Sequence, residues 1–142
     1  MNPRTLIEWS LCLGAILHFS ILLASVQVPR ALDWKSALAP LPKLLRQLFW
    51  VYGAFIVGII IAFGLLSLLL APQLARGGAT SLALIILIAV FWSARLGVQF
   101  FVFDVRQHLT RPLYRIGYRL LTGNLVALVL VYGGTALWLA TR

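Results

Sequence analysis

Residues 81–104 read SLALIILIAVFWSARLGVQFFVFD, and this stretch decides the fold. It is almost entirely apolar and long enough to cross a bilayer, which takes about 20 apolar residues. Arg95 lies well inside it. An unpaired arginine in hydrocarbon costs at least about 2.5–3.5 kcal/mol. We therefore predict that the stretch spans a membrane and that the Arg95 guanidinium faces other helices.

Three more stretches of similar length and apolarity accompany it. The 142 residues are 62% hydrophobic and 11% charged, against about 45–50% and about 25% in soluble domains. We predict an all-α fold, a four-transmembrane-helix bundle that forms one integral membrane domain over residues 1–142. The expected spans are residues 5–28, 48–71, 81–104 and 120–140, joined by basic linkers at 29–47 and 105–119.

The formal net charge of +9 does not indicate nucleic-acid binding, because the cations lie at the ends of the apolar runs. Four spans place both termini on one side and linkers one and three on the other. The linkers hold Arg30, Lys35, Lys43, Arg46, Arg106, Arg111, Arg115 and Arg119, whereas the other side holds Arg4, Arg76 and Arg142. The positive-inside rule then predicts cytoplasmic linkers and non-cytoplasmic termini in a bacterial inner membrane.

Prolines and small residues suggest where helices end and where they meet. We expect Pro29 and Pro72 to end the first and second spans and 73–80 to form a short turn. Asp33 is expected to cap a short interfacial helix at 34–39, and an ordered polar loop is the alternative for this segment. In the second span, Ala54, Gly58 and Ala62 recur every fourth residue, which is typical of a close-packing face. Gly53 and Gly64 lie elsewhere on that helix and suggest a second contact.

Polar side chains inside the spans suggest a common layer. At about 1.5 Å per residue, Tyr52, Gln99 and Asn124 come within one turn in depth, and Arg95 and His18 lie about a turn deeper. Ser10, Gly14 and His18 share a helix face, so His18 is expected to point into the bundle. One interpretation is a hydrogen-bonded belt that fixes helix register. The other is a site for a quinone, a lipid or an anion, with candidate ligand-binding residues Arg95, Gln99, Trp92, His18, Asn124 and Tyr52.

Other chemistries find little support in the residues. Catalytic motifs are absent, so we expect no enzymatic activity and no cofactor. A haem held within one chain needs two histidines at matching depth, and His18 and His108 do not match; a haem shared with a neighbour through His18 stays open. Asp104 and His108 are one turn apart, but two ligands do not make a metal site. Cys12 is the only cysteine, which excludes an intrachain disulfide.

Some features resemble a known group of proteins. Tyr52-Gly53 opens the second span, Gly58 and Gly64 lie within it, and the third span contains Ala94-Arg95-Leu96. In these features the chain resembles the small four-helix bacterial membrane proteins of the DoxX-like type. The resemblance implies a membrane bundle, and some members are tied to quinone-linked redox complexes.

Small-residue faces and aromatic faces are more numerous than one small bundle can bury. We therefore expect an accessory or scaffold subunit that packs against other membrane protein subunits within the lipid bilayer. The alternative is a quinone- or lipid-binding protein centred on Arg95. A small transporter is a further alternative, since exporters of the small multidrug type share the four spans and the length, although they depend on a deep glutamate and Glu8 lies near the boundary.

Overall fold

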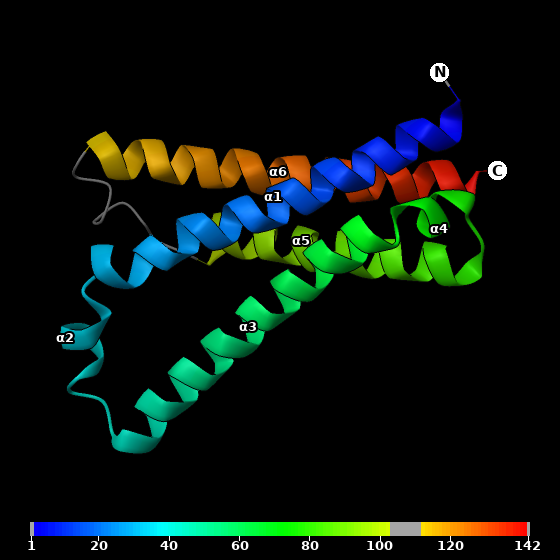
Figure 1. Cartoon of the computed structure of the whole chain (residues 1–142). Helices are drawn as coiled ribbons and strands as arrows, with labels where there is room; N and C mark the ends of the chain where they lie inside the picture. Colours follow the sequence, from blue (N-terminus) through cyan, green and yellow to red (C-terminus); the bar gives the residue numbers. More distant parts are fainter. Residues whose placement is uncertain (1, 103–111, 142) are drawn as a thin grey trace.

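The computed structural model describes residues 2–102 and 112–141, and every regular element in that part of the chain is a helix (Figure 1). The predicted all-α class is therefore confirmed. The elements are α1 (Pro3–Ala31), α2 (Trp34–Leu38), α3 (Lys43–Leu69), α4 (Ala71–Arg76), α5 (Ala79–Phe101) and α6 (Pro112–Ala140).

The four long helices, α1, α3, α5 and α6, are each long and apolar enough to cross a membrane. The shortest, α5, has 23 residues and so extends about 35 Å at about 1.5 Å per residue. The chain is thus a multi-pass membrane protein. Figure 1 shows the N- and C-termini at one end of the molecule and α2 at the other, as four alternating spans require.

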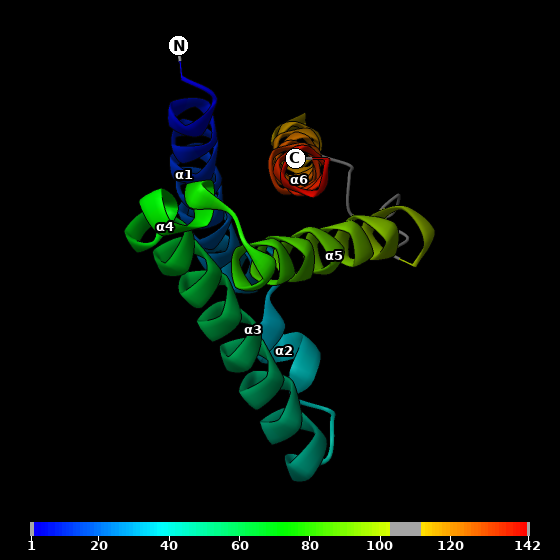
Figure 2. The same cartoon turned by 90° about the vertical axis from the view of Figure 1, so that its right-hand side faces the viewer.

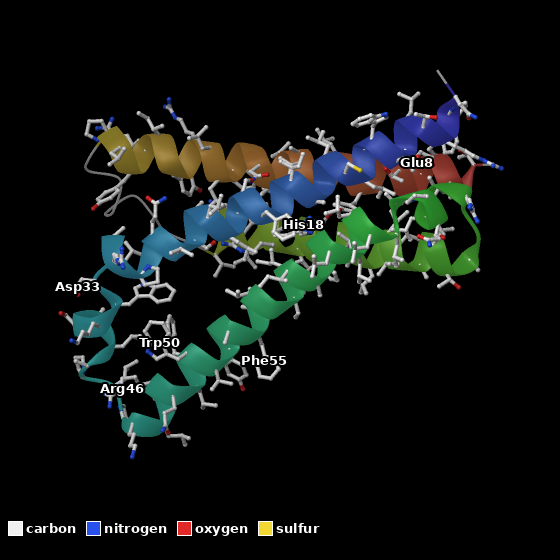
Figure 3. The ribbon with its side chains drawn as sticks, viewed as in Figure 1. Glu8, His18, Asp33, Arg46, Trp50 and Phe55 are labelled. Carbon is white, nitrogen blue, oxygen red and sulfur yellow. The ribbon has the colours of Figure 1, made fainter. Side chains whose placement is uncertain are left out.

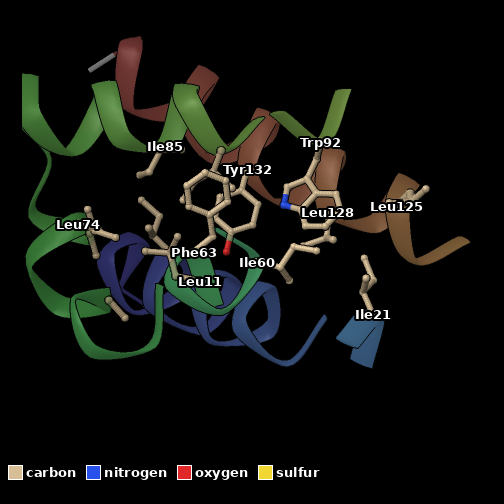
Figure 4. Close-up of a cluster of buried hydrophobic side chains, with 14 residues drawn as sticks. Leu11, Ile21, Ile60, Phe63, Leu74, Ile85, Trp92, Leu125, Leu128 and Tyr132 are labelled. Carbon is tan, nitrogen blue, oxygen red and sulfur yellow. The ribbon is translucent and has the colours of Figure 1, made fainter. Parts of the chain in front are cut away.

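The core lies between α1, α5, α6 and the C-terminal part of α3. Helix α1 packs along α3, α4 and α6, and α5 packs along α6. Figure 4 shows the buried apolar side chains that these helices bring together. The largest fully buried members are Leu11, Ile85, Ile88, Trp92, Leu125, Leu128 and Tyr132.

Helix α3 joins the core over only part of its length. Its buried residues are Ile60, Phe63, Gly64 and Ser67, all in the C-terminal part. Residues 43–59, here named the α3 arm, have exposed side chains on every side of the helix apart from the partly covered Arg46 and Gly53. Figures 1 and 2 show the α3 arm diverging from the other long helices.

Two of the predicted helix ends are wrong. Pro29 lies inside α1, which continues to Ala31. Proline has no N–H to donate to the carbonyl four residues earlier, and α1 continues for only two residues beyond it. Pro72 does not simply stop a helix either: it lies in the first turn of α4, where its fixed φ favours helix initiation.

Helix α4 differs from the prediction, which ends the second span at residue 71 and places a turn at 73–80. It forms because Ala71, Leu74 and Ala75 lie on one side and are buried against the core. The turn is confined to Gly77 and Gly78, whose φ angles of 81° and 110° are accessible to glycine.

The short helix between the first two spans is confirmed as α2, but its expected cap is wrong. Asp33 occupies the N-cap position with φ 44° and ψ 54°, and its side chain makes no capping hydrogen bond. A capping residue normally has an extended backbone from which the carboxylate reaches the following N–H groups. In the left-handed conformation of Asp33 that bond is not made.

Candidate functional site

His18 lies at the centre of the bundle and is fully buried (Figure 3). Its Nε2 accepts a hydrogen bond from Trp92 Nε1 at 2.9 Å, and its Nδ1 lies 2.7 Å from the carbonyl oxygen of Gly14. An indole nitrogen only donates, so Nε2 carries no proton. The proton is then on Nδ1, which donates to Gly14. The two partners therefore select one tautomer of the imidazole.

Two hydroxyl groups extend this arrangement to the remaining helices. Tyr132 Oη lies 2.6 Å from Ser67 Oγ and 3.5 Å from His18 Nδ1. All of these side chains are buried, and Figure 4 shows the Trp92 and Tyr132 rings within the core. We name His18, Ser67, Trp92 and Tyr132 the His18 node. Each of the four long helices contributes one residue to it.

Aromatic contacts surround the imidazole as well. The ring centroid of His18 lies 5.2 Å from that of Trp92, 5.5 Å from Tyr132 and 6.2 Å from Phe63, with interplanar angles of 70–81°. Edge-to-face pairs of this kind add about 0.5–1.5 kcal/mol beyond their buried area. The His18 node is thus a packed element as well as a hydrogen-bonded one.

Two glycines make this close packing possible. A Cβ atom on Gly14 would lie 2.5 Å from Tyr132 Oη and 2.8 Å from Tyr132 Cζ. A Cβ on Gly64 would lie 3.2 Å from His18 Cβ and from Phe19 Cζ. The prediction that Gly64 marks a contact is confirmed, whereas a Cβ on Gly53 would have no atom within 4 Å. A Cβ on Gly58 would also have no atom within 4 Å, so the face of Ala54, Gly58 and Ala62 stays a prediction for packing against another chain.

A second polar group joins α5 to α6. Arg95 Nη1 donates to Gln99 Oε1 at 3.2 Å, and Gln99 Nε2 donates to Thr122 Oγ1 at 3.4 Å. Thr122 in turn donates to the carbonyl of Tyr118 at 2.8 Å. Gln99 is buried and Arg95 is partly buried. Arg95 therefore donates to a polar side chain of its own helix, and Gln99 makes the connection to α6.

A third polar group joins α6 to α1. Asn124 Nδ2 donates to Ser20 Oγ at 2.5 Å and to the carbonyl of Leu17 at 3.3 Å. Asn124 Oδ1 is buried and has no hydrogen-bond partner among the residues of 2–102 and 112–141. Half of this amide's hydrogen-bonding capacity is thus left unused.

The six candidate residues therefore separate into three groups and one outlier. His18 and Trp92 meet in the His18 node, Arg95 and Gln99 meet on α5, and Asn124 bonds to α1. Tyr52 is 63% exposed on the α3 arm, so its predicted place in a shared layer is wrong. A count of residues along a helix gives depth, but it does not reveal that one helix diverges from the others.

Ser67 and Tyr132 are the members of the His18 node that the sequence analysis did not select. Both could have been selected from the sequence, because each is a polar side chain within an apolar run. Trp92 is one of the six candidate residues, and in the structure its indole donates to His18. The predicted face of Ser10, Gly14 and His18 is confirmed for the last two, which are buried.

Hollows at the surface lie away from these polar groups. One of about 260 Å³ lies between the start of α1 and the end of α6. Another of about 410 Å³ is lined by Val51, Ala54, Phe55, Gly58, Ile59 and Ala62. Neither is lined by any of the six candidate residues. No cluster of three or more His, Cys, Asp or Glu side chains occurs in the described part of the chain, and the Asp104–His108 pair lies outside it.

Comparison with protein-family models, with curated proteins and with solved structures finds no match to this chain.

Proposed function

We propose that this protein is an accessory or scaffold subunit that packs against another membrane protein and has no catalytic activity of its own. The observation that carries the proposal is the α3 arm, whose side chains are exposed on every side although the same helix is well packed further along. A subunit whose role is to hold a partner needs a surface that its own helices leave uncovered.

The outer face of the α3 arm has the composition of a helix-packing surface. Ala54 and Gly58 form a small-residue stripe that continues to Ala62 beyond the arm. Gly58 lies two residues from the buried Ile60, about 200° around the helix, so the stripe faces away from the core. Helices associate in lipid where small residues allow close approach. The 410 Å³ hollow on this face is where we place a helix of the partner.

The His18 node supports a structural role for the buried polar groups. Its four side chains are bonded to one another, and the described hollows do not reach them. Intramembrane polar groups pair because lipid offers no hydrogen-bond partner. The belt interpretation therefore accounts for His18, Ser67, Trp92 and Tyr132 without a ligand.

The second candidate function is quinone or lipid binding at Arg95. It is favoured by the partial exposure of this cation beside Gln99. Arg95→Leu separates the two candidates: loss of a co-purifying quinone or lipid with an intact bundle supports a ligand site, whereas loss of the folded bundle supports the belt. Transport by this small chain is the weakest of the alternatives.

Photo-crosslinking tests the accessory role. A crosslinking amino acid is placed at Phe55 on the α3 arm and, as a matched control, at Leu130 on α6; both side chains are 68% exposed. The proposal predicts a discrete protein adduct from position 55 and only lipid adducts from position 130. Native mass analysis in mild detergent should then show the same partner. A monomer that yields no protein adduct from position 55 would contradict the proposal.

The orientation belongs to the same proposal. We place α2 and the basic linkers in the cytoplasm and both termini outside, in a bacterial inner membrane. A phosphatase that works only outside the cytoplasm, fused to the C-terminus, is expected to be active. An inactive fusion at normal expression would reverse the orientation.

A further inference from the structure

The end of the molecule that contains α2 carries an excess of positive charge. Arg30, Lys35 and Lys43 are exposed there, and Arg46 is partly exposed. Asp33 is the only carboxylate between residues 29 and 47. The Arg46 guanidinium donates to the carbonyl of Ala39 at 3.5 Å, which ties the start of α3 to the end of α2. No ion pair of Arg30, Lys35 or Lys43 occurs within residues 2–102 and 112–141.

Three aromatic rings lie beside these cations. Trp34 of α2 is 4.9 Å from Phe49 and 5.8 Å from Trp50, measured between ring centroids, and Phe49 is 6.2 Å from Trp50. Figure 3 shows Trp50 and Arg46 at the same end of the α3 arm. Tryptophan side chains favour the level of the lipid head groups. We name Trp34, Phe49 and Trp50 the aromatic trio.

Below the aromatic trio the α3 arm is exposed and apolar. Tyr52 and Ile56 lie one turn apart, and each leaves more than a third of its surface uncovered. Neither of them lines the 410 Å³ hollow. From the α2 end along the α3 arm, a cationic surface is therefore followed by the aromatic trio and then by an uncovered apolar helix surface. An anionic phospholipid presents the same sequence of groups, a negative phosphate followed by ester groups and acyl chains.

We propose that the α2 end of the α3 arm binds an anionic phospholipid. Lys35 and Lys43 attract the phosphate group, the aromatic trio lies at the ester level, and one acyl chain lies along the α3 arm. The preference for an anionic lipid follows from the charge count, because a zwitterionic head group brings its own cation to a segment, residues 29–47, that contains four cations and one carboxylate. This site is distinct from the stripe of Ala54, Gly58 and Ala62 and stands or fails separately from the accessory role.

The test uses the purified full-length chain in mild detergent, titrated with phosphatidylglycerol and with phosphatidylcholine and followed by native mass spectrometry. The charge-removing variant is K35Q/K43Q, which leaves the Arg46–Ala39 bond intact. The matched control is R4Q/R76Q, which removes two exposed cations from the opposite end of the molecule. Circular dichroism establishes that both variants are folded.

The wild type is expected to retain phosphatidylglycerol at least fivefold more strongly than phosphatidylcholine. A cation near an anionic surface contributes roughly fivefold, so K35Q/K43Q should lose about tenfold or more in affinity for phosphatidylglycerol, while R4Q/R76Q stays within twofold. Equal losses in the two variants, or a wild type with no preference, would overturn the proposal. An acidic protein that co-elutes in place of lipid would overturn it as well.

Discussion

The two halves of α3 are both rich in apolar residues, but one half packs against other helices and the other half is exposed. From Ile60 onward the helix buries one side against α1 and contributes Ser67 to the His18 node. From Lys43 to Ile59 its large apolar side chains are exposed. Hydropathy alone therefore does not decide where helices pack. What distinguishes the packed half is a glycine that faces a neighbour, Gly64, and a hydroxyl with a buried partner.

This difference follows from the solvent. Lipid tails are as apolar as leucine, so burying leucine between helices in a bilayer gains little. Helices meet where small residues admit a neighbour and where polar groups find partners. Gly14, Gly64 and His18 meet these conditions, whereas Gly58 is small but has no neighbour within 4 Å among the described residues.

The largest expected effect comes from removing the centre of the packed region. His18→Ala deletes the imidazole, leaves Trp92 Nε1 without its acceptor and opens a cavity, which should cost on the order of 2–5 kcal/mol of unfolding free energy. Tyr52→Ala on the α3 arm is the control and should stay within about 0.5 kcal/mol. Reversible unfolding in mixed detergent measures both. Equal losses would erase the distinction between the two regions.

Glycine-to-alanine substitutions compare the packed position of Gly14 with the exposed position of Gly58, because each adds only one methyl group. Gly14→Ala places a methyl group against the Tyr132 ring and should cost about 1–3 kcal/mol. Gly58→Ala meets no atom within 4 Å and should leave the unfolding free energy unchanged or slightly raised. The thermal midpoints of the two variants provide the measurement. A Gly14→Ala protein as stable as the wild type would show that α1 and α6 are further apart than the structure has them.

A smaller loss is expected when one hydrogen bond is removed and the ring is kept. Trp92→Phe retains the aromatic contact with His18 but deletes the N–H donor. Hydrogen bonds between membrane helices contribute about 0.6 kcal/mol on average and up to about 1.7 kcal/mol, so the loss should fall in that range, plus a contribution from the smaller ring. The same unfolding assay applies. A loss as large as that of His18→Ala would make Trp92 the main contributor instead.

Among the buried polar groups, the smallest effect is expected at Asn124. Asn124→Leu removes two donated hydrogen bonds and also a buried oxygen that has no partner in the described residues. These two contributions oppose each other, so the unfolding free energy should change by less than about 1 kcal/mol. A larger destabilisation would indicate that Oδ1 is satisfied by a group such as bound water.

Part of this arrangement was predictable from sequence. Four long apolar runs predict four helices, and the spacing of Gly14 and His18 places both on an inward face. The divergence of the α3 arm was not predictable, because periodicity gives neither crossing angles nor the rotation of a helix about its axis. For the same reason Tyr52 was assigned to the core, and Ser67 and Tyr132 were missed. Each of the three polar groups connects particular helices, and only the packed structure shows which helices are neighbours.

Nitrogen-15 NMR of histidine-labelled protein tests most directly the claim that one buried imidazole joins all four helices. The chain has two histidines, so a His108→Gln variant leaves the His18 signals alone. We expect a protonated Nδ1 and an unprotonated Nε2 that shifts when Trp92 is replaced by Phe. A protonated Nε2, or an Nε2 signal that ignores the Trp92 substitution, would contradict the account.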